Sequence, residues 1–302
     1  MRAIVLPAYG PASAFELRTL PDPAPAANEI LVRMAGASIN PVDWKQRSGA
    51  IHMYMPLEFP AVIGRDASGT VAAVGPGVTG FAVGDRVLGR FPRGGYAELI
   101  VAPVDAWARL PAKLDVVDAG ALPLVLLTGG ELAEEAVDAR AGESILVTGA
   151  TGAVGRVAVF VAKRRGAKVY AGVRGKHRDA AAQLGADAVV ALDDAADVAR
   201  LPTLDGIADT VGGETAQALL AKLAPGGKLG SVVGPPAGAA ERGFVVRAFF
   251  TRTDTKRLAD LAQVVADGTL VVPIAARFPL AEARAAHELA EKGAGGKVLL
   301  LG

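Results

Sequence analysis

The first 120 residues carry short apolar runs that alternate with turn-forming residues. Runs such as RAIVLP, EILVRMAG, SGTVAAVG and DRVLGRF are separated by Gly, Pro, Asn and Asp. Apolar runs of this length with such boundaries are typical of β-strands. The pattern predicts a compact β-rich or barrel-like domain over residues 1–120.

Beyond residue 120 the pattern changes. Strand-like runs alternate with Ala-rich helical runs to about residue 252, as expected for a parallel sheet built from βαβ units. The tail then holds a helical run, TDTKRLADLAQVVADG, followed by LVVPIAARF, LAEARAAHELAEKG and GKVLLLG. Because its last strands resemble the first domain, we expect residues 268–302 to complete that domain and residues 121–267 to form the parallel-sheet domain.

Composition agrees with two soluble domains. The chain has 302 residues, longer than one core usually grows, and its 32 basic side chains nearly cancel 31 acidic ones. A balanced charge argues against nucleic acid or a membrane surface as the main partner. The absence of cysteine excludes disulfides and thiolate chemistry. No apolar stretch is as long as a membrane span and the opening residues do not resemble a signal peptide, so we expect a cytoplasmic protein.

A glycine-rich turn, VTGATGAVGR at residues 147–156, lies between a strand-like run and a helical run. Gly149, Gly152 and Gly155 permit a tight bend and a close approach of the backbone to a ligand. The free N–H groups at the start of the helix would face a phosphate. The same glycines would also suit a plain tight turn, but with strands on both sides the turn predicts a dinucleotide site.

The end of the next strand-like run indicates which dinucleotide binds. NAD requires a carboxylate there for the ribose hydroxyls, whereas this chain reads VRGKHR. Arg174, Lys176, His177 and Arg178 would instead neutralise a 2′-phosphate, although they would also suit a solvated helix start. The sequence therefore favours NADPH as the cofactor.

Several blocks in a fixed order make the chain similar to a known family. They are INPVDWK at 39–45, FPAVIGRDASGTVAAVG at 59–75, GDRVLG at 84–89, GGYAE at 94–98, the glycine turn and DTVGG at 209–213. With them the chain resembles the zinc-independent quinone oxidoreductase branch of the medium-chain dehydrogenase/reductase superfamily. The resemblance implies an α/β protein with a Rossmann doubly wound parallel sheet, a GroES-like β-rich catalytic domain, and NADPH in the cleft between them.

Zinc ligands are missing from the blocks that would carry them. Where zinc-dependent relatives have Cys and Gly-His-Glu, this chain has Asn40 and Gly64-Arg65-Asp66. The three histidines are scattered along the chain, which does not suggest a metal site. Without a metal, alcohol oxidation loses the group that lowers the hydroxyl pKa. Hydride transfer from NADPH to a quinone or an α,β-unsaturated carbonyl needs only orientation and hydrogen-bond donors.

The resemblance places three candidate side chains beside the reacting groups. Asn40 matches an Asn near the nicotinamide, and Tyr54 matches a tyrosine on a loop over the substrate. Thr128 matches a threonine whose hydroxyl bonds the cofactor. Each also has an ordinary alternative, namely a turn residue before Pro41, an aromatic ring packed on Met and Pro, and a helix N-cap.

Further cofactor contacts follow from the matched blocks. Lys297 would reach toward the cofactor phosphate, although a lysine at such a place is more often on the surface. The expected cofactor-binding residues are Pro41, Thr151, Gly152, Ala153, Val154, Arg174, Lys176, His177, Arg178, Val211, Val233 and Lys297.

Other functions remain to be weighed. The turn also resembles that of short-chain reductases, but no tyrosine is followed four residues later by the lysine which that family needs. Reduction of an enoyl thioester, or NADPH binding with little catalysis, stays open. The apolar run GFVVRAFF at 243–250 reads as an exposed edge strand, which favours a homodimer over a buried strand without a partner.

Overall fold

The computed structural model describes residues 1–302, and the chain divides into two compact units. The first contains Met1–Leu124 and Thr253–Gly302, and the second contains Val125–Arg252. The first domain is thus interrupted by the second, as the tail predicted. The second unit was expected to end at residue 267, whereas it ends at Arg252. Helix α7 (Thr255–Ala266) therefore belongs to the first unit.

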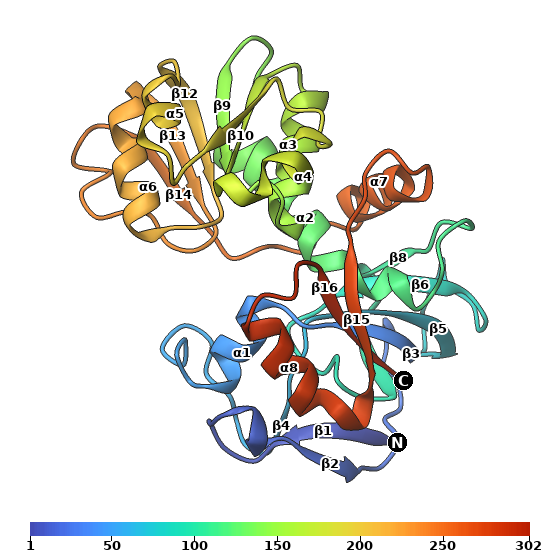
Figure 1. The fold of residues 1–302 in the computed structure, drawn as a ribbon. Coiled ribbons are helices and arrows are strands. Elements are labelled where there is room, and N and C mark those ends of the chain that lie inside the picture. The colour runs from blue at the N-terminus through green and yellow to red at the C-terminus, as the bar shows by residue number, and fades with distance from the viewer. The chain divides into compact units, whose positions relative to one another are not determined.

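The first unit is built from two sheets (Figure 1). The smaller has the order β2-β1-β4, and the larger runs β15-β16-β3-β5-β6-β8 with β7 paired to β3. The strands are β1 (Arg2–Leu6), β2 (Glu16–Thr19), β3 (Glu29–Ser38), β4 (Ala61–Val62), β5 (Asp66–Val74), β6 (Arg86–Arg90), β7 (Leu99–Pro103), β8 (Trp107–Arg109), β15 (Ile274–Pro279) and β16 (Lys297–Leu301). The helices are α1 (Pro41–Arg47), α7 and α8 (Ala283–Glu291).

Strand β16 brings the end of the chain into this sheet, between β15 and β3. It pairs antiparallel with β3, where Leu299 lies opposite Ser38. Leu299 and Leu300 are fully buried, while helix α8 packs on both β15 and β16. The first 120 residues therefore lack the two strands, β15 and β16, that extend their larger sheet beyond β3.

The second unit holds one parallel sheet with helices on both faces (Figure 1). Its order, β11-β10-β9-β12-β13-β14, is the 3-2-1-4-5-6 order of the Rossmann fold. The strands are β9 (Ser144–Thr148), β10 (Lys168–Val173), β11 (Ala188–Ala191), β12 (Leu204–Asp209), β13 (Leu223–Ser231) and β14 (Val245–Ala248). The helices are α2 (Pro123–Glu131), α3 (Ala153–Arg164), α4 (Arg178–Ala182), α5 (Ala195–Ala199) and α6 (Gly213–Leu219).

Both sequence predictions about this sheet are confirmed. The glycine turn connects β9 to α3, and the run at 243–250 contains β14, which pairs with β13 at one edge. The strand order reverses between β9 and β12, so the turn after β9 lies at the switch point where such sheets bind ligands.

Two glycines in the first unit hold backbones in contact. A Cβ on Gly36 would lie 2.2 Å from the carbonyl oxygen of Val117. A Cβ on Gly120 would lie 2.4 Å from the carbonyl oxygen of Gly36. Any side chain here would force β3 away from the 3₁₀ turn at Asp118–Ala121.

We expect Gly36→Ala to lower the free energy of unfolding of the first unit by about 3 kcal/mol, the upper end of overpacking costs. Trp44 and Trp107, the two tryptophans, both lie in this unit, so their fluorescence during urea unfolding reports on it. The control is Gly10→Ala, whose Cβ meets only the Ala14 side chain, at 3.1 Å. If the two variants unfolded at the same urea concentration, the expectation would be wrong.

Candidate functional site

The glycine turn has the geometry of a backbone cradle. Gly149 has φ of +62°, and a Cβ on Gly155 would lie 2.3 Å from the carbonyl oxygen of Gly149. Gly152 is exposed and is the N-cap of α3. The first N–H groups of α3 have no acceptor within the helix, so they are available to an anion. The turn residues therefore fit the pyrophosphate of a dinucleotide.

Asp209, at the end of β12, ties the neighbouring turns together. Its fully buried carboxylate accepts hydrogen bonds from the Thr148 and Ser231 hydroxyls, at 2.8 and 3.0 Å. It also accepts from the backbone N–H of Val211 and of Gly212, at 3.1 and 3.0 Å. One carboxylate thus fixes the ends of β9, β12 and β13.

The expected cofactor-binding residues of this unit gather along the same edge of the sheet. Thr151, Ala153 and Val154 are half-buried around the turn. Val211 and Val233 are exposed where β12 and β13 end. They follow the carboxyl ends of adjacent parallel strands, as residues at a dinucleotide crevice do.

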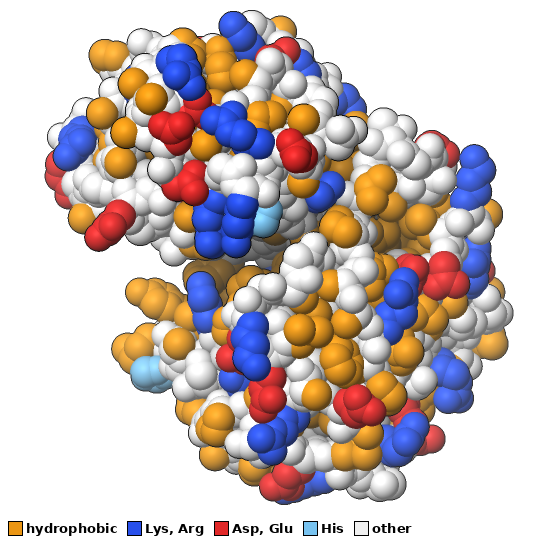
Figure 2. All heavy atoms as spheres, viewed as in Figure 1, with side chains coloured by type: hydrophobic (Ala, Val, Ile, Leu, Met, Phe, Trp, Pro, Cys, Tyr) orange, Lys and Arg blue, Asp and Glu red, His pale blue; other side chains and the backbone are white.

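Basic side chains follow β10 at this edge. Arg174, Lys176 and His177 are exposed. Figure 2 shows a group of Lys and Arg side chains next to one of the pale blue histidines on the surface. Arg178 differs, because its guanidinium bonds the buried carboxylate of Asp197. Three of the four expected phosphate-binding side chains are thus open to a ligand, and the fourth already has a carboxylate partner.

A second polar centre is buried in the first unit around Asn40. The Asn40 amide nitrogen donates to Ser38 Oγ and to Asp66 Oδ1, both at 3.1 Å. Its oxygen accepts from Lys297 Nζ at 2.6 Å, and that ammonium also donates to the carbonyl of Ile39 at 3.0 Å. Ser38 and Asp66 are fully buried, so the lysine and the carboxylate are held together through the amide.

The network continues through Asp43. Its Oδ2 accepts from the backbone N–H of Asn40 at 2.8 Å and from the Tyr96 hydroxyl at 3.1 Å. His287 Nε2 lies 3.2 Å from that hydroxyl, and Arg47 Nη1 lies 3.0 Å from His287 Nδ1. Arginine only donates, so His287 is neutral with its proton on Nε2, and every donor points toward Asp43.

Burial controls the protonation of this network. Desolvation, followed by the charge of Asp66, raises the pKa of Asp43 to about 7. Desolvation also raises the pKa of Asp66 and lowers the pKa of Lys297. Desolvation, helped by Arg47, lowers the pKa of His287 to about 3. The network thus holds Asp43 close to a change of protonation at neutral pH.

The structure shows protein partners for two of the expected residues. Asn40 is 1% exposed and its amide bonds Ser38, Asp66 and Lys297, so it organises the network, and its expected contact with a cofactor or an acceptor stays a prediction. The ammonium of Lys297 is buried against Asn40 rather than free to reach a phosphate. Pro41, by contrast, is exposed as the first residue of α1.

The alternatives considered for Tyr54 and Thr128 do not hold. The Tyr54 side chain is 75% exposed, so it is not packed in a core. Thr128 lies inside α2 instead of at its N-cap, and its hydroxyl lies 2.6 Å from that of Thr251. Their expected contacts with an acceptor and a cofactor stay predictions.

The network residues that sequence reasoning missed sit in recognisable positions. Arg65 and Asp66 lie in the GRDASG block, and Tyr96 lies in GGYAE. His287 falls on the buried face of α8 beside Ala283 and Ala286. Polar residues inside otherwise apolar blocks are the sequence feature that could have predicted this buried network.

No group of three His, Cys, Asp or Glu side chains is close enough to hold a metal ion. No helix is both long and apolar enough to cross a bilayer.

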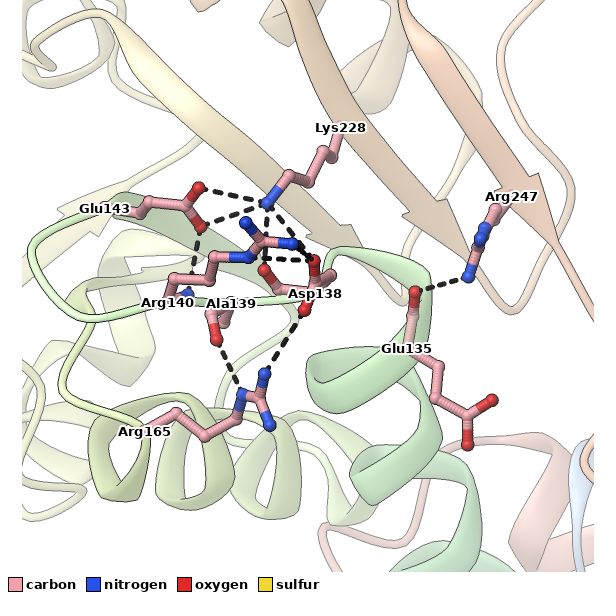
Figure 3. Close-up of polar contacts among 8 residues, drawn as sticks. All are labelled: Glu135, Asp138, Ala139, Arg140, Glu143, Arg165, Lys228 and Arg247. Atoms are coloured by element: carbon pink, nitrogen blue, oxygen red, sulfur yellow. Dashed lines mark hydrogen bonds and ion pairs between the residues drawn. The ribbon is translucent and has the colours of Figure 1, made fainter.

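The second unit has a cavity of about 390 Å³ away from the glycine turn. It is lined by residues that include Asp138, Lys228 of β13 and Arg247 of β14, whose polar contacts are drawn in Figure 3. Lys228 bonds the Asp138 carbonyl and the Glu143 carboxylate, at 2.9 and 3.0 Å, and Arg247 bonds the carbonyl of Glu135 at 2.8 Å. Lys228 and Arg247 are thus both bonded to protein oxygens.

Comparison with known families gives two matches. Residues 26–112 match the alcohol dehydrogenase GroES-like domain, and residues 184–300 match the zinc-binding dehydrogenase family.

Three relatives cover different shares of the chain. A quinone oxidoreductase of Pseudomonas aeruginosa is 32% identical, with 99% of each chain covered. A chloroplast envelope quinone oxidoreductase homologue of Arabidopsis thaliana is 36% identical over 63% of this chain and 60% of its own length. An acryloyl-coenzyme A reductase of Metallosphaera sedula is 28% identical over 76% of this chain and 75% of its own.

Solved structures resemble the whole chain. The quinone oxidoreductase of Coxiella burnetii has a TM-score of 0.91 at 27% identity, with 100% of this chain and 99% of that chain covered. A mycobacterial protein in complex with NADPH has a TM-score of 0.87 at 30% identity, and an NAD-dependent alcohol dehydrogenase has 0.89 at 28%. Both cover 100% of each chain.

We expect Asp43→Asn to change how stability depends on pH. Folding raises the pKa of Asp43 from 3.8 to about 7, so its contribution is complete below pH 3.8 and is lost as the pH rises through 7. The variant cannot ionise, so its stability relative to wild type should rise between pH 5 and pH 8. One pKa unit corresponds to about 1.4 kcal/mol, and we expect at least this change.

Calorimetric unfolding at several pH values measures the effect. The control is Asp105→Asn, at an exposed aspartate of the same unit. If the free energies of unfolding of Asp43→Asn and wild type change in parallel from pH 5 to pH 8, the raised pKa assigned to Asp43 is wrong.

Proposed function

The chain belongs to the zinc-independent quinone oxidoreductase branch of the medium-chain dehydrogenase/reductase superfamily, and from that premise we propose that it reduces a quinone or an α,β-unsaturated carbonyl with NADPH. The observation that carries the proposal is a combination of two features. The glycine turn after β9 fits a pyrophosphate, and exposed basic side chains follow β10. NADPH, when bound, supplies the hydride. This chain's residues bind and orient the cofactor.

The preference for NADPH over NADH rests on the end of β10. Arg174, Lys176 and His177 are exposed basic residues at the position where an NAD-binding chain would place a carboxylate. Guanidinium and ammonium donors would neutralise a 2′-phosphate but offer the ribose hydroxyls no acceptor. The solved relative in complex with NADPH is consistent with this choice.

The acceptor class follows from the residues at the ligand positions of zinc-dependent relatives. Asn40, Arg65 and Asp66 offer neither thiolate nor imidazole, so we propose chemistry that does not depend on zinc. An acceptor with a conjugated carbonyl delocalises the negative charge that hydride addition creates. Reduction of an enoyl thioester is the second candidate, favoured by the similarity to an acryloyl-coenzyme A reductase.

We further propose a cytoplasmic homodimer that pairs through β14. This strand has a neighbour on one side only, and Val245 is 51% exposed. An apolar edge strand of a parallel sheet is a natural place for a second copy to add.

Turnover tests the proposal directly. With a chelator present, we expect oxidation of NADPH by a small ortho-quinone, and much slower oxidation of NADH. Turnover of an enoyl thioester but not of quinones would select the second candidate. Tight NADPH binding without turnover of any acceptor would count against an enzymatic role.

Cofactor binding tests the basic cluster separately. We expect Arg174→Ala and Lys176→Ala each to weaken NADPH binding by about 10-fold or more, because each removes a charge-assisted hydrogen bond. NADH binding should change little. Titration of nucleotide fluorescence gives both constants, with the exposed Arg242→Ala as control. Equal weakening for both nucleotides would show that the cluster does not read the 2′-phosphate.

A further inference from the structure

Arg65 is held rigidly at the edge of the buried network. It lies between β4 and β5, directly before Asp66, and its carbonyl accepts the N–H of Phe91 at 2.9 Å. The residue is only 6% exposed. A charged side chain so deeply buried requires partners for both its charge and its N–H groups.

The guanidinium of Arg65 has few such partners. It donates to the thioether of Met55 at 3.0 Å, a weak acceptor, and its Nε has no hydrogen-bond partner. No carboxylate lies within 4.0 Å of it. Its donors are therefore left for an acceptor that the protein does not supply.

A second buried arginine of the same unit, Arg47, has a fuller set of partners than Arg65. Arg47 donates to the Gly10 carbonyl at 3.2 Å, lies 3.0 Å from His287 Nδ1, and forms an ion pair with Glu291 at 2.7 Å. Arg65 has no equivalent set. The difference separates an arginine that links elements from one that is open to a ligand.

The electrostatic surroundings also leave the positive charge of Arg65 incompletely balanced. The charge that acts on it is that of Asp43, whose pKa burial raises to about 7, so this carboxyl is only partly ionised at neutral pH. Burial accordingly lowers the pKa of Arg65. An anion that reached the guanidinium would restore the balance.

We propose that Arg65 binds the carbonyl oxygen of the acceptor and stabilises the negative charge that forms there during reduction. This inference rests on the proposed function. Arg65 occupies the place of the histidine ligand of zinc-dependent relatives, so the guanidinium would provide the electrophile that the metal provides in them. Met55, which contacts Arg65, belongs to the same loop as the exposed Tyr54, a candidate for acceptor binding.

The chemistry balances with the cofactor as the two-electron reductant. Hydride adds to the β-carbon of an enone, a C–H bond forms, and the electron pair of the C=C bond moves through the conjugated system to the carbonyl oxygen. Arg65 donates hydrogen bonds to this oxyanion and keeps its own protons, while water supplies the proton that completes the product. A quinone gives a hydroquinone anion by the same balance.

Binding of a phenolate tests the proposal without turnover. A phenolate resembles the enolate and the hydroquinone anion, and 4-nitrophenol reports its ionisation by absorbance. We expect wild type to lower the pKa of bound 4-nitrophenol, and Arg65→Gln to bind the phenolate about 10- to 100-fold more weakly. Arg33→Gln, at an exposed arginine of β3, is the matched control and should bind as wild type does.

Kinetics provides the second readout. Loss of a donor to a developing oxyanion should lower kcat of Arg65→Gln by about 10²- to 10³-fold with a smaller change in KM. NADPH affinity, measured by fluorescence, should not change. Arg65→Lys keeps the charge and should recover part of the activity.

The outcomes separate the two proposals. Turnover by wild type with unchanged kcat and phenolate binding in Arg65→Gln would overturn the role of Arg65 and leave the proposed function standing. If Arg65→Gln weakens phenolate binding but wild type reduces no acceptor, the anion-binding role of Arg65 stands and the proposed function is overturned. If Arg65→Gln does not fold, the pKa of 4-nitrophenol bound to the wild-type protein is the test. An unchanged pKa of the bound phenol would overturn the proposal.

Discussion

The buried ammonium of Lys297 is the interaction on which the first unit depends. It joins the last strand of the chain to Asn40, and Asn40 in turn holds Ser38 and Asp66. A buried charge of either sign is costly without a partner, so the lysine and the carboxylate must be enclosed together or not at all. The packing of β16 against β3 and the start of α1 are therefore coupled through one amide side chain.

The same contacts define how charge is distributed in the buried network. Lys297 faces Asp66 through Asn40, while Asp43 receives donors from the other side through Tyr96. His287 is kept neutral between Tyr96 and Arg47. At the edge of this network the guanidinium of Arg65 is a buried charge without a carboxylate partner, and its Nε has no hydrogen-bond partner.

The sequence predicted the second unit more completely than the first. The turn after β9, helix α3 and edge strand β14 are encoded locally, by glycine spacing and by the period of apolar residues. The resemblance to a family supplied the first unit and its return at the chain end. What no local pattern encodes is that Lys297 meets Asn40 across 257 positions, or that His287 meets Tyr96 across 191.

For the same reason sequence reasoning did not foresee that Asn40 and Lys297 are partners of one another. An amide before Pro41 and a lysine at the start of β16 each look available to a ligand when read singly. Burial decides otherwise, because each satisfies the other's polar group inside the core. Burial and long-range pairing must be seen before a polar residue is placed at a reacting centre.

The division of the first unit also bears on how the chain is made. A ribosome releases Met1–Leu124 long before β16, so these residues first emerge without the strand that pairs with β3 and without the ammonium that bonds Asn40. Residues 125–252 contain every strand of their own sheet and can fold as soon as they are out. The order of synthesis is therefore reversed in folding: the inserted domain matures first, and the amino-terminal half waits for the last residues of the chain.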